Sequence, residues 1–229
     1  MLREIGTELW LADGPAVRFL GFFDYPTRMV VARLADGGLW VWSPIALDDA
    51  LAREVDALGP VRHLVEPNKL HHLPLATWVE RYPEALPHPP PGLAKKRPEL
   101  PWQTELGDEA PAAWASQIDQ LVFRGSPALE ELFFFHRASR TAIVCDLVQR
   151  FDPATLTGWR RWLMRLDGLV GPDGGAPREW RASCWNRRAA RASLERALAW
   201  DPERLVIAHG VLPEENGRTA LAHAFRWLT

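Results

Sequence analysis

The order of hydrophobic and polar positions predicts strands in the first part of the chain. Four apolar runs have the length of strands: 8–11, 16–20, 28–34 and 38–42. Asp13-Gly14-Pro15 predicts a turn between the first two runs. Asp36-Gly37 lies between the last two, and this dipeptide is a strong short-range signal for a β-hairpin. The pattern therefore indicates antiparallel strands at the start of the fold.

After these runs the pattern changes to helices that alternate with strands. Helices are predicted at 47–58 and 70–82, where apolar residues recur at helical spacing, and Gly59-Pro60 ends the first helix. Residues 83–101 are rich in proline and predict a connection with room for one short strand or turn of helix. Further strands are predicted at 63–66, 120–123, 132–135, 141–146 and 204–208.

The last third of the chain is mainly helical. Asp152-Pro153 is typical of a helix start. The apolar positions of this helix predict its buried face: Leu156, Trp159, Leu163 and Leu166. Two more helices are predicted, at 187–200 and near the C-terminus. Hairpins followed by alternating helices and strands favour mixed sheets covered by helices.

The composition is typical of a folded protein and predicts one domain over residues 1–229. With 47% apolar and 24% charged residues, the chain can bury a large core, so the composition argues against disorder. The formal net charge of -2 favours neither nucleic acid nor an anionic membrane as a partner. The basic run 95–97 lies among prolines and is interpreted as a solvated loop. We therefore expect a small-molecule substrate or ligand.

The sequence also predicts a location for the protein. Cys145 and Cys184 are too few for a disulfide framework. The N-terminus has no signal-peptide pattern, and no apolar run approaches the ~20 residues needed to cross a bilayer. We expect a cytoplasmic protein, and the sequence leaves its oligomeric state open.

Four polar side chains occupy positions where ligands often bind. His71 and His72 open a predicted helix, whereas Asp146 and His209 lie at the ends of predicted strands. Imidazole and carboxylate groups together suit zinc, iron or manganese. The residues alone leave two interpretations open: a metal site, or histidines that cap elements and pack in the core.

The order of elements resembles the metallo-β-lactamase superfamily across nearly the whole chain. Trp-x-Trp-Ser-Pro at 40–44, Pro-Asn-x-x-His-His at 67–72 and Cys-Asp at 145–146 resemble, more narrowly, a bacterial family of unknown function within that superfamily. The resemblance implies an α/β fold, the four-layer αββα sandwich with mixed sheets. It assigns no reaction.

The resemblance also implies a degenerate form of the superfamily motif His-x-His-x-Asp-His. His72 matches the last histidine, and His71 stands in place of the aspartate. Pro67 and Lys69 stand in place of the first two histidines, and Gly125-Ser126 in place of a later Gly-His pair. The ligands of the superfamily's first metal are therefore absent.

By the same resemblance, the sequence keeps the ligands of the superfamily's second metal. Asp146 matches the bridging aspartate and His209 the closing histidine. The resemblance thus implies one divalent metal ion, zinc before iron or manganese, bound by His71, His72, Asp146 and His209. Lys69 and Asp146 are the catalytic candidates, because a lysine ammonium can replace a lost cation beside a carboxylate and hold an anionic group.

Two functional hypotheses follow. The first is a mononuclear metal-dependent hydrolase of a small ester, amide or thioester. If all four side chains bound the ion tetrahedrally, no position would remain for water and the site would be structural. The second is a non-catalytic binding or scaffold protein with a vestigial, metal-free site.

Neighbouring polar residues receive simpler interpretations. Asn68 is a candidate polar contact near the site. Glu130-Glu131, before an apolar strand, is interpreted as a solvated edge, and His63 and His88 as structural or surface residues.

Overall fold

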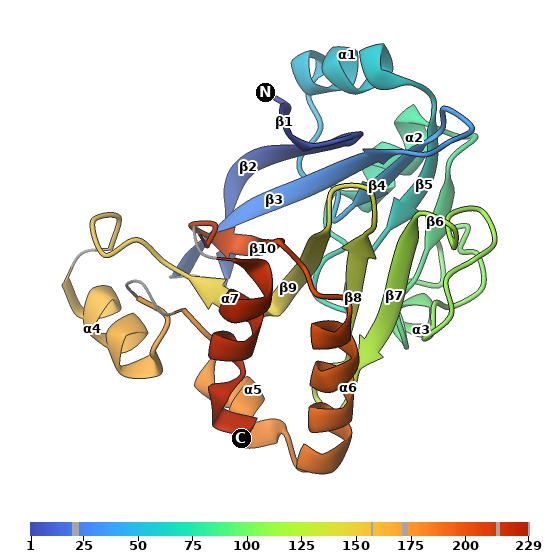
Figure 1. Ribbon diagram of the computed structural model, residues 1–229. Coiled ribbons are helices and arrows are strands. Elements are labelled where there is room, and N and C mark those ends of the chain that lie inside the picture. The colour runs from blue at the N-terminus through green and yellow to red at the C-terminus, as the bar shows by residue number, and fades with distance from the viewer. Residues whose placement is uncertain (20–22, 157, 171–173, 214–215, 229) are drawn as a thin grey trace.

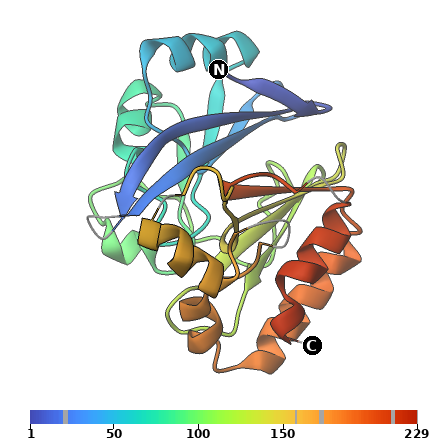
Figure 2. The ribbon, with the colours of Figure 1, turned by 90° about the vertical axis from the view of Figure 1, so that its left-hand side faces the viewer.

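Two β-sheets face one another in the computed structural model of the chain, with helices on both outer faces (Figure 1). The structure describes residues 1–19, 23–156, 158–170, 174–213 and 216–228. Each sheet combines antiparallel and parallel pairs of strands. The turned view in Figure 2 separates the two sheets and shows the helices outside them.

The first sheet has the strand order β1-β2-β3-β4-β5-β6. Its strands are β1 Arg3–Gly6, β2 Leu9–Phe19, β3 Phe23–Arg33, β4 Leu39–Trp42, β5 Val61–Val65 and β6 Leu86–His88. The strands from β1 to β4 are antiparallel, and β5 and β6 each run parallel to the strand before. The predicted hairpin at Asp36-Gly37 joins β3 to β4.

The second sheet has the order β10-β9-β8-β7. Its strands are β7 Ile118–Phe123, β8 Glu131–His136, β9 Thr141–Arg150 and β10 Arg204–Gly210. The strands β7, β8 and β9 are antiparallel, whereas β10 is parallel to β9.

Helices cover the outer face of each sheet. The described helices are α1 Asp49–Leu58, α2 Leu75–Arg81, α3 Leu93–Lys96, α4 Gly158–Asp167, α5 Arg178–Ser183, α6 Arg187–Ala199 and α7 Gly217–Ala224, with a 3-10 turn at Arg226–Leu228. Buried residues of α1 and α2 pack with the outer face of the first sheet. Those of α6 and α7 pack with the outer face of the second.

Alternating side chains explain the layers. In β4, Trp40 and Trp42 point into the core between the sheets, whereas Leu39 and Val41 pack beneath the helices. Each strand therefore contributes to two apolar layers, and three apolar layers hold four layers of secondary structure together. The prediction of an α/β, four-layer αββα sandwich with mixed sheets is confirmed.

Three predicted elements differ from the structure. The turn at 13–15 is wrong: β2 continues through it, and its register with β3 shifts between Gly14 and Val17, where Pro15 has no N–H to donate. Leu20, the predicted end of that strand, lies outside the described residues. The helix predicted at 70–82 begins only at Leu75, because the Asn68 side chain accepts from the backbone N–H of Leu70 and His71 and forms a turn instead.

The third difference concerns the helix after Pro153. It begins at Gly158, and its predicted buried face is exposed: 56% of Trp159, 45% of Leu163 and 48% of Leu166 are accessible to solvent. Among the residues of this helix whose burial the structure describes, Met164 alone is buried. Among the described helices, none is long and apolar enough to cross a membrane.

Candidate metal centre

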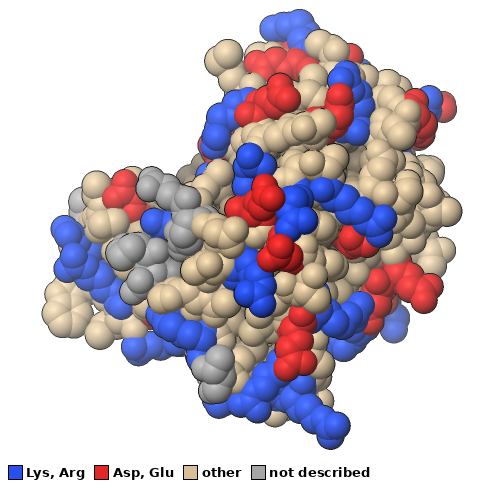
Figure 3. Space-filling view, viewed as in Figure 1, with Lys and Arg blue, Asp and Glu red and all other residues tan. Residues whose placement is uncertain are grey.

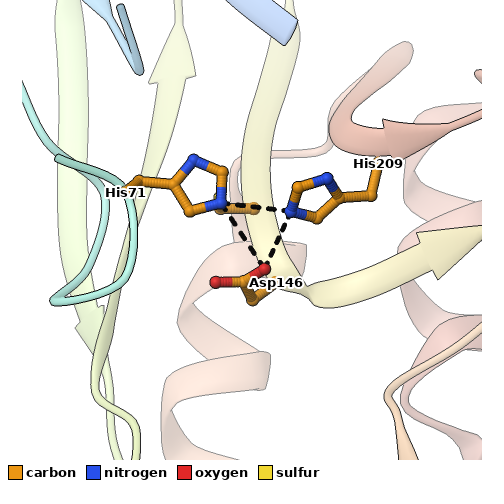
Figure 4. Close-up of side chains that lie close together, drawn as sticks. His71, Asp146 and His209 are labelled. Carbon is orange, nitrogen blue, oxygen red and sulfur yellow. Dashed lines mark hydrogen bonds and ion pairs between the residues drawn. The ribbon is translucent and has the colours of Figure 1, made fainter. Parts of the chain in front are cut away.

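Three predicted ligands meet at the edge where the two sheets approach each other. His71 lies in the loop between β5 and α2, Asp146 lies in β9, and His209 lies near the end of β10 (Figure 4). His209 Nε2 is 2.9 Å from Asp146 Oδ1 and 3.1 Å from His71 Nε2. The third separation, from His71 Nε2 to Asp146 Oδ1, is 3.5 Å. Segments far apart in sequence thus direct two imidazoles and one carboxylate to one point.

A bulge in β9 directs Asp146 to this point. Val144 pairs with Ile207, but the next pair is Gln149 with His209, so four residues of β9 oppose one residue of β10. Glu131 holds the bulge, since its Oε1 accepts from the backbone N–H of Cys145 at 2.7 Å. Its Oε2 accepts from the backbone N–H of Asp146 at 2.7 Å and of Leu147 at 3.2 Å. The interpretation of Glu131 as a solvated residue is therefore wrong: its side chain is fully buried and is required to satisfy the bulge.

The second oxygen of Asp146 is occupied by Asn68. Asn68 Nδ2 donates to Asp146 Oδ2 at 2.8 Å and to Glu131 Oε2 at 3.2 Å. Burial would raise the pKa of the Asp146 carboxyl, but the contacts with His71 and His209 outweigh burial and lower it. Burial and the charge of Asp146 raise the pKa of the Glu131 carboxyl. Asp146 is therefore ionised, with Oδ1 directed at the imidazoles.

The tautomer of His209 follows from its second contact. His209 Nδ1 lies 2.7 Å from the backbone oxygen of Pro26, which can only accept, so Nδ1 carries a hydrogen. In a neutral ring, Nε2 then presents a lone pair to Asp146 Oδ1, which is also an acceptor. Two acceptors 2.9 Å apart require a cation between them, either a second proton on the imidazole or a metal ion.

The separations fit metal coordination. Three atoms spaced as these are lie on a circle of radius about 1.9 Å, smaller than a zinc–nitrogen bond of about 2.0–2.1 Å, so one ion can contact all three. Cys145 Sγ belongs to the same group, whose ligand atoms all lie within 4.8 Å of one another. Burial raises the pKa of the Cys145 thiol, and the nearby carboxylates add to this effect. His71, Asp146 and His209 are therefore the primary donors.

Two predicted site residues, His72 and Lys69, lie outside the cluster. His72 Nδ1 accepts from the Arg97 guanidinium at 2.8 Å, and burial with the charges of Lys96 and Arg97 lowers the pKa of His72 to about 4. The structure does not bring His72 into the cluster, because adjacent side chains of the loop diverge and only His71 faces Asp146. Lys69 does not line the cavity beside Asp146 in the described structure; its backbone oxygen accepts from Lys96 Nζ at 2.8 Å, and Lys96 lines that cavity.

A pocket of about 400 Å³ opens beside the cluster. Its walls are mostly apolar, and they include Val17, Ile45, Leu73, Pro74 and Trp180. Polar groups reach it from His71, Asp146, His209, Gln149, Glu179 and Lys96. This volume and this mixture of apolar walls with a few polar groups are typical of small-molecule sites.

Sequence reasoning missed two polar groups of this pocket. Gln149 is buried and donates from Nε2 to the backbone oxygen of Asp146, while its Oε1 has no hydrogen-bond partner within the described residues. Glu179 extends from α5, a helix that the pattern did not predict. A glutamine within an apolar strand was the available signal for the first, and nothing in the pattern marked the second.

Comparisons with known proteins agree with this architecture. A family model described as "Domain of unknown function (DUF4336)" matches residues 18–156. Among curated proteins, none matches the sequence. Three similar solved structures have 9–12% sequence identity to the chain, and each alignment includes 100% of the chain.

These three structures show the fold of the chain. A metallo-β-lactamase from Pontibacter korlensis is 12% identical with a TM-score of 0.63, over 98% of its length. The metallo-β-lactamase FIM-1 from Pseudomonas aeruginosa, in its mono-zinc form, is 9% identical with a TM-score of 0.65, over 94% of its length. Rubredoxin oxygen:oxidoreductase from Desulfovibrio gigas is 12% identical with a TM-score of 0.67, over 60% of its length. The chain has the metallo-β-lactamase fold.

Proposed function

The chain belongs to the family described as "Domain of unknown function (DUF4336)", and from its site we propose a mononuclear metal-dependent hydrolase of a small-molecule substrate. His71, Asp146 and His209 would hold one divalent ion, zinc before iron or manganese. A divalent ion in such a site supplies Lewis acidity, which lets hydrolases activate water near neutral pH. Three protein ligands would leave a position for that water.

The observation that carries this proposal is the meeting of two acceptors at His209. Its Nδ1 hydrogen donates to Pro26, so Nε2 faces Asp146 Oδ1 as a lone pair. The contact of His71 Nδ1 with Ser43 Oγ at 2.9 Å fixes the position of the second imidazole. Such outer contacts orient the imidazoles of metal centres. The metallo-β-lactamase FIM-1, which has the same fold, is known in a mono-zinc form.

The pocket supports a substrate with an apolar part and a polar group near the cluster. Trp180 and Ile45 would contact the apolar part. Gln149 Oε1, which has no hydrogen-bond partner within the described residues, would accept a hydrogen bond from an N–H or O–H of the substrate. Lys96 lines the pocket and would hold an anionic group of the substrate, the role predicted for Lys69.

A second candidate is a binding protein without metal. The 2.9 Å contact between His209 Nε2 and Asp146 Oδ1 also suits a protonated imidazole paired with a carboxylate. In that case the apolar pocket would still bind a small molecule, but no ion would activate water.

Metal analysis separates the two candidates. The protein is purified without added metal, then loaded with zinc, iron or manganese and dialysed. We expect about one equivalent of metal, lost in His71→Ala and His209→Ala but retained in the adjacent control His72→Ala. Less than about a tenth of an equivalent after loading would favour the binding protein.

Turnover then tests the hydrolase. The loaded protein is assayed on a panel of small aromatic esters, amides and thioesters, with His209→Ala as the inactive control. If the protein binds metal but shows no turnover above that control, the proposed metal centre stands and hydrolysis of these substrates is rejected.

A further inference from the structure

Helix α4 presents its apolar side to solvent. Trp159, Trp162, Leu163 and Leu166, which we call the α4 stripe, recur at the spacing of one helical face. Trp162 is 69% exposed and Leu163 45% exposed. The buried Met164 anchors the opposite side of the helix against Phe151 and Leu169. An amphipathic helix of a globular protein normally buries its apolar stripe, so this helix has the reverse orientation.

The region around α4 is strongly basic. Residues 158–191 contain eight arginines and three acidic residues, whereas the whole chain has a net charge of -2. The rest of the chain is therefore acidic, and positive charge is concentrated in this one segment. Arg161 and Arg165 are exposed on α4 itself. Figure 3 shows Lys and Arg side chains gathered over the lobe that contains α4, at the left of the view.

We propose that the α4 stripe and its arginines dock the protein on the surface of an anionic lipid bilayer. Tryptophan and leucine on one face of a helix, with arginines beside them, are the pattern of helices that lie in the bilayer interface. Tryptophan is favoured there because its ring is both apolar and polar. A bilayer surface supplies the negative charge that the basic segment complements. The net charge of the whole chain predicted no membrane partner, because it averages the basic segment with the acidic remainder. This proposal replaces that expectation.

The position of α4 relates this surface to the pocket. Met164 packs in a cluster with Phe151, against which Tyr25 lies, and Tyr25 lines the pocket. Asp167 at the end of α4 accepts from the backbone N–H of Arg178, the first residue of α5, and α5 contributes Glu179 and Trp180 to the pocket wall. Docking by α4 would therefore place the pocket near the bilayer. The docking itself does not depend on metal or on hydrolysis.

Sedimentation with vesicles tests the proposal directly. The whole protein is mixed with vesicles of phosphatidylcholine alone or with about 30% phosphatidylserine. We expect binding to the anionic vesicles only, and weaker binding as salt rises from about 0.05 to 0.5 M. Equal binding to both vesicles, or binding to neither, would overturn the proposal.

Matched variants assign the binding to α4. Leu163→Gln should weaken it about tenfold, whereas Leu86→Gln, a similarly exposed leucine on β6, should not. Arg161→Gln with Arg165→Gln should weaken binding about fivefold for each charge removed. Arg53→Gln with Arg62→Gln, in α1 and β5, removes the same charge away from α4 and is the control. Unchanged unfolding midpoints confirm that the variants fold. Unchanged binding in the α4 variants would reject this surface.

Solution size excludes the main competing occupant. A second copy of the chain could cover the same stripe. We expect a monomer by light scattering at the concentrations used for sedimentation. A dimer that Leu163→Gln dissociates would overturn the bilayer proposal and identify the stripe as an interface between copies.

Discussion

Asn68 Nδ2 donates to Asp146 Oδ2 at 2.8 Å, which leaves only Oδ1 of this carboxylate directed toward the imidazoles. The same amide nitrogen lies 3.2 Å from Glu131 Oε2. One side chain thus separates two buried carboxyl groups and selects which oxygen of Asp146 can bind a cation. A metal ion would therefore bind on the side of His71 and His209.

Substitution of Asn68 tests this selection. Asn68→Leu keeps the size of the side chain but removes the donor to Asp146 and the acceptor of the turn that presents His71. Asp146 can then rotate, and its repulsion with Glu131 increases. We expect metal affinity to fall about 10- to 100-fold, as for other residues that orient ligands. Competition with a chromophoric chelator measures the affinity. An affinity equal to that of the wild type would show that Asn68 does not orient Asp146.

Glu131 should matter for stability more than its neighbour. Glu131→Gln replaces one acceptor oxygen by an NH₂ group, which then faces backbone N–H groups of the β9 bulge. Leaving a buried donor unsatisfied costs about 1–3 kcal/mol, and we expect the free energy of unfolding to fall by this amount. Urea denaturation measures it, and Glu130→Gln, which is not fully buried, is the control. Equal effects of the two variants would contradict the role of Glu131.

The strands and their layers were predictable because they depend on local patterns. Alternation in β4 places Trp40 and Trp42 on one face regardless of distant residues, and Asp36-Gly37 fixes the hairpin before it. The site was only partly predictable. Asn68 stabilises a turn, and this turn determines which of the two adjacent histidines faces Asp146. Because of the same turn, α2 begins at Leu75 rather than at Leu70.

The features that the sequence did not predict depend on contacts between residues far apart in the chain. Glu131 looks like a solvated acid beside Glu130 until the β9 bulge presents backbone N–H groups to it. The helical spacing of Trp159, Leu163 and Leu166 was recognised, but spacing identifies an apolar face without saying what covers it. Burial of that face depends on neighbours that the pattern does not contain.

A buried pair of histidines predicts sensitivity to acid. His63 Nδ1 lies 3.1 Å from His88 Nε2, and burial, with the nearby His63, lowers the pKa of His88 to about 3. An unfolded histidine titrates near 6.5, so between these pH values the unfolded state binds a proton that the folded state does not. Stability is therefore retained above pH about 6.5 and falls as the pH decreases, by up to about 1.4 kcal/mol per unit for this group.

Urea denaturation at several pH values between about 7.5 and 4.5 measures this slope. His88→Gln can keep a hydrogen bond to His63 but cannot titrate, so its unfolding free energy should change less steeply with pH. Titration of the carboxyl groups is common to both proteins and cancels in the comparison. Identical slopes would mean that His88 does not exclude the proton in the folded state.

Metal binding should stabilise the fold, because its ligands come from segments that only the folded chain brings together. His71, Asp146 and His209 lie on a loop and two strands, and unfolding separates them. A ligand that binds only the folded state adds about 2.7 kcal/mol at a free concentration 100 times its dissociation constant. Thermal unfolding with and without zinc should therefore show a higher midpoint in the loaded protein. Asp146→Asn should lose this increment and His72→Gln should keep it; an increment that survives Asp146→Asn would place the ion at other residues.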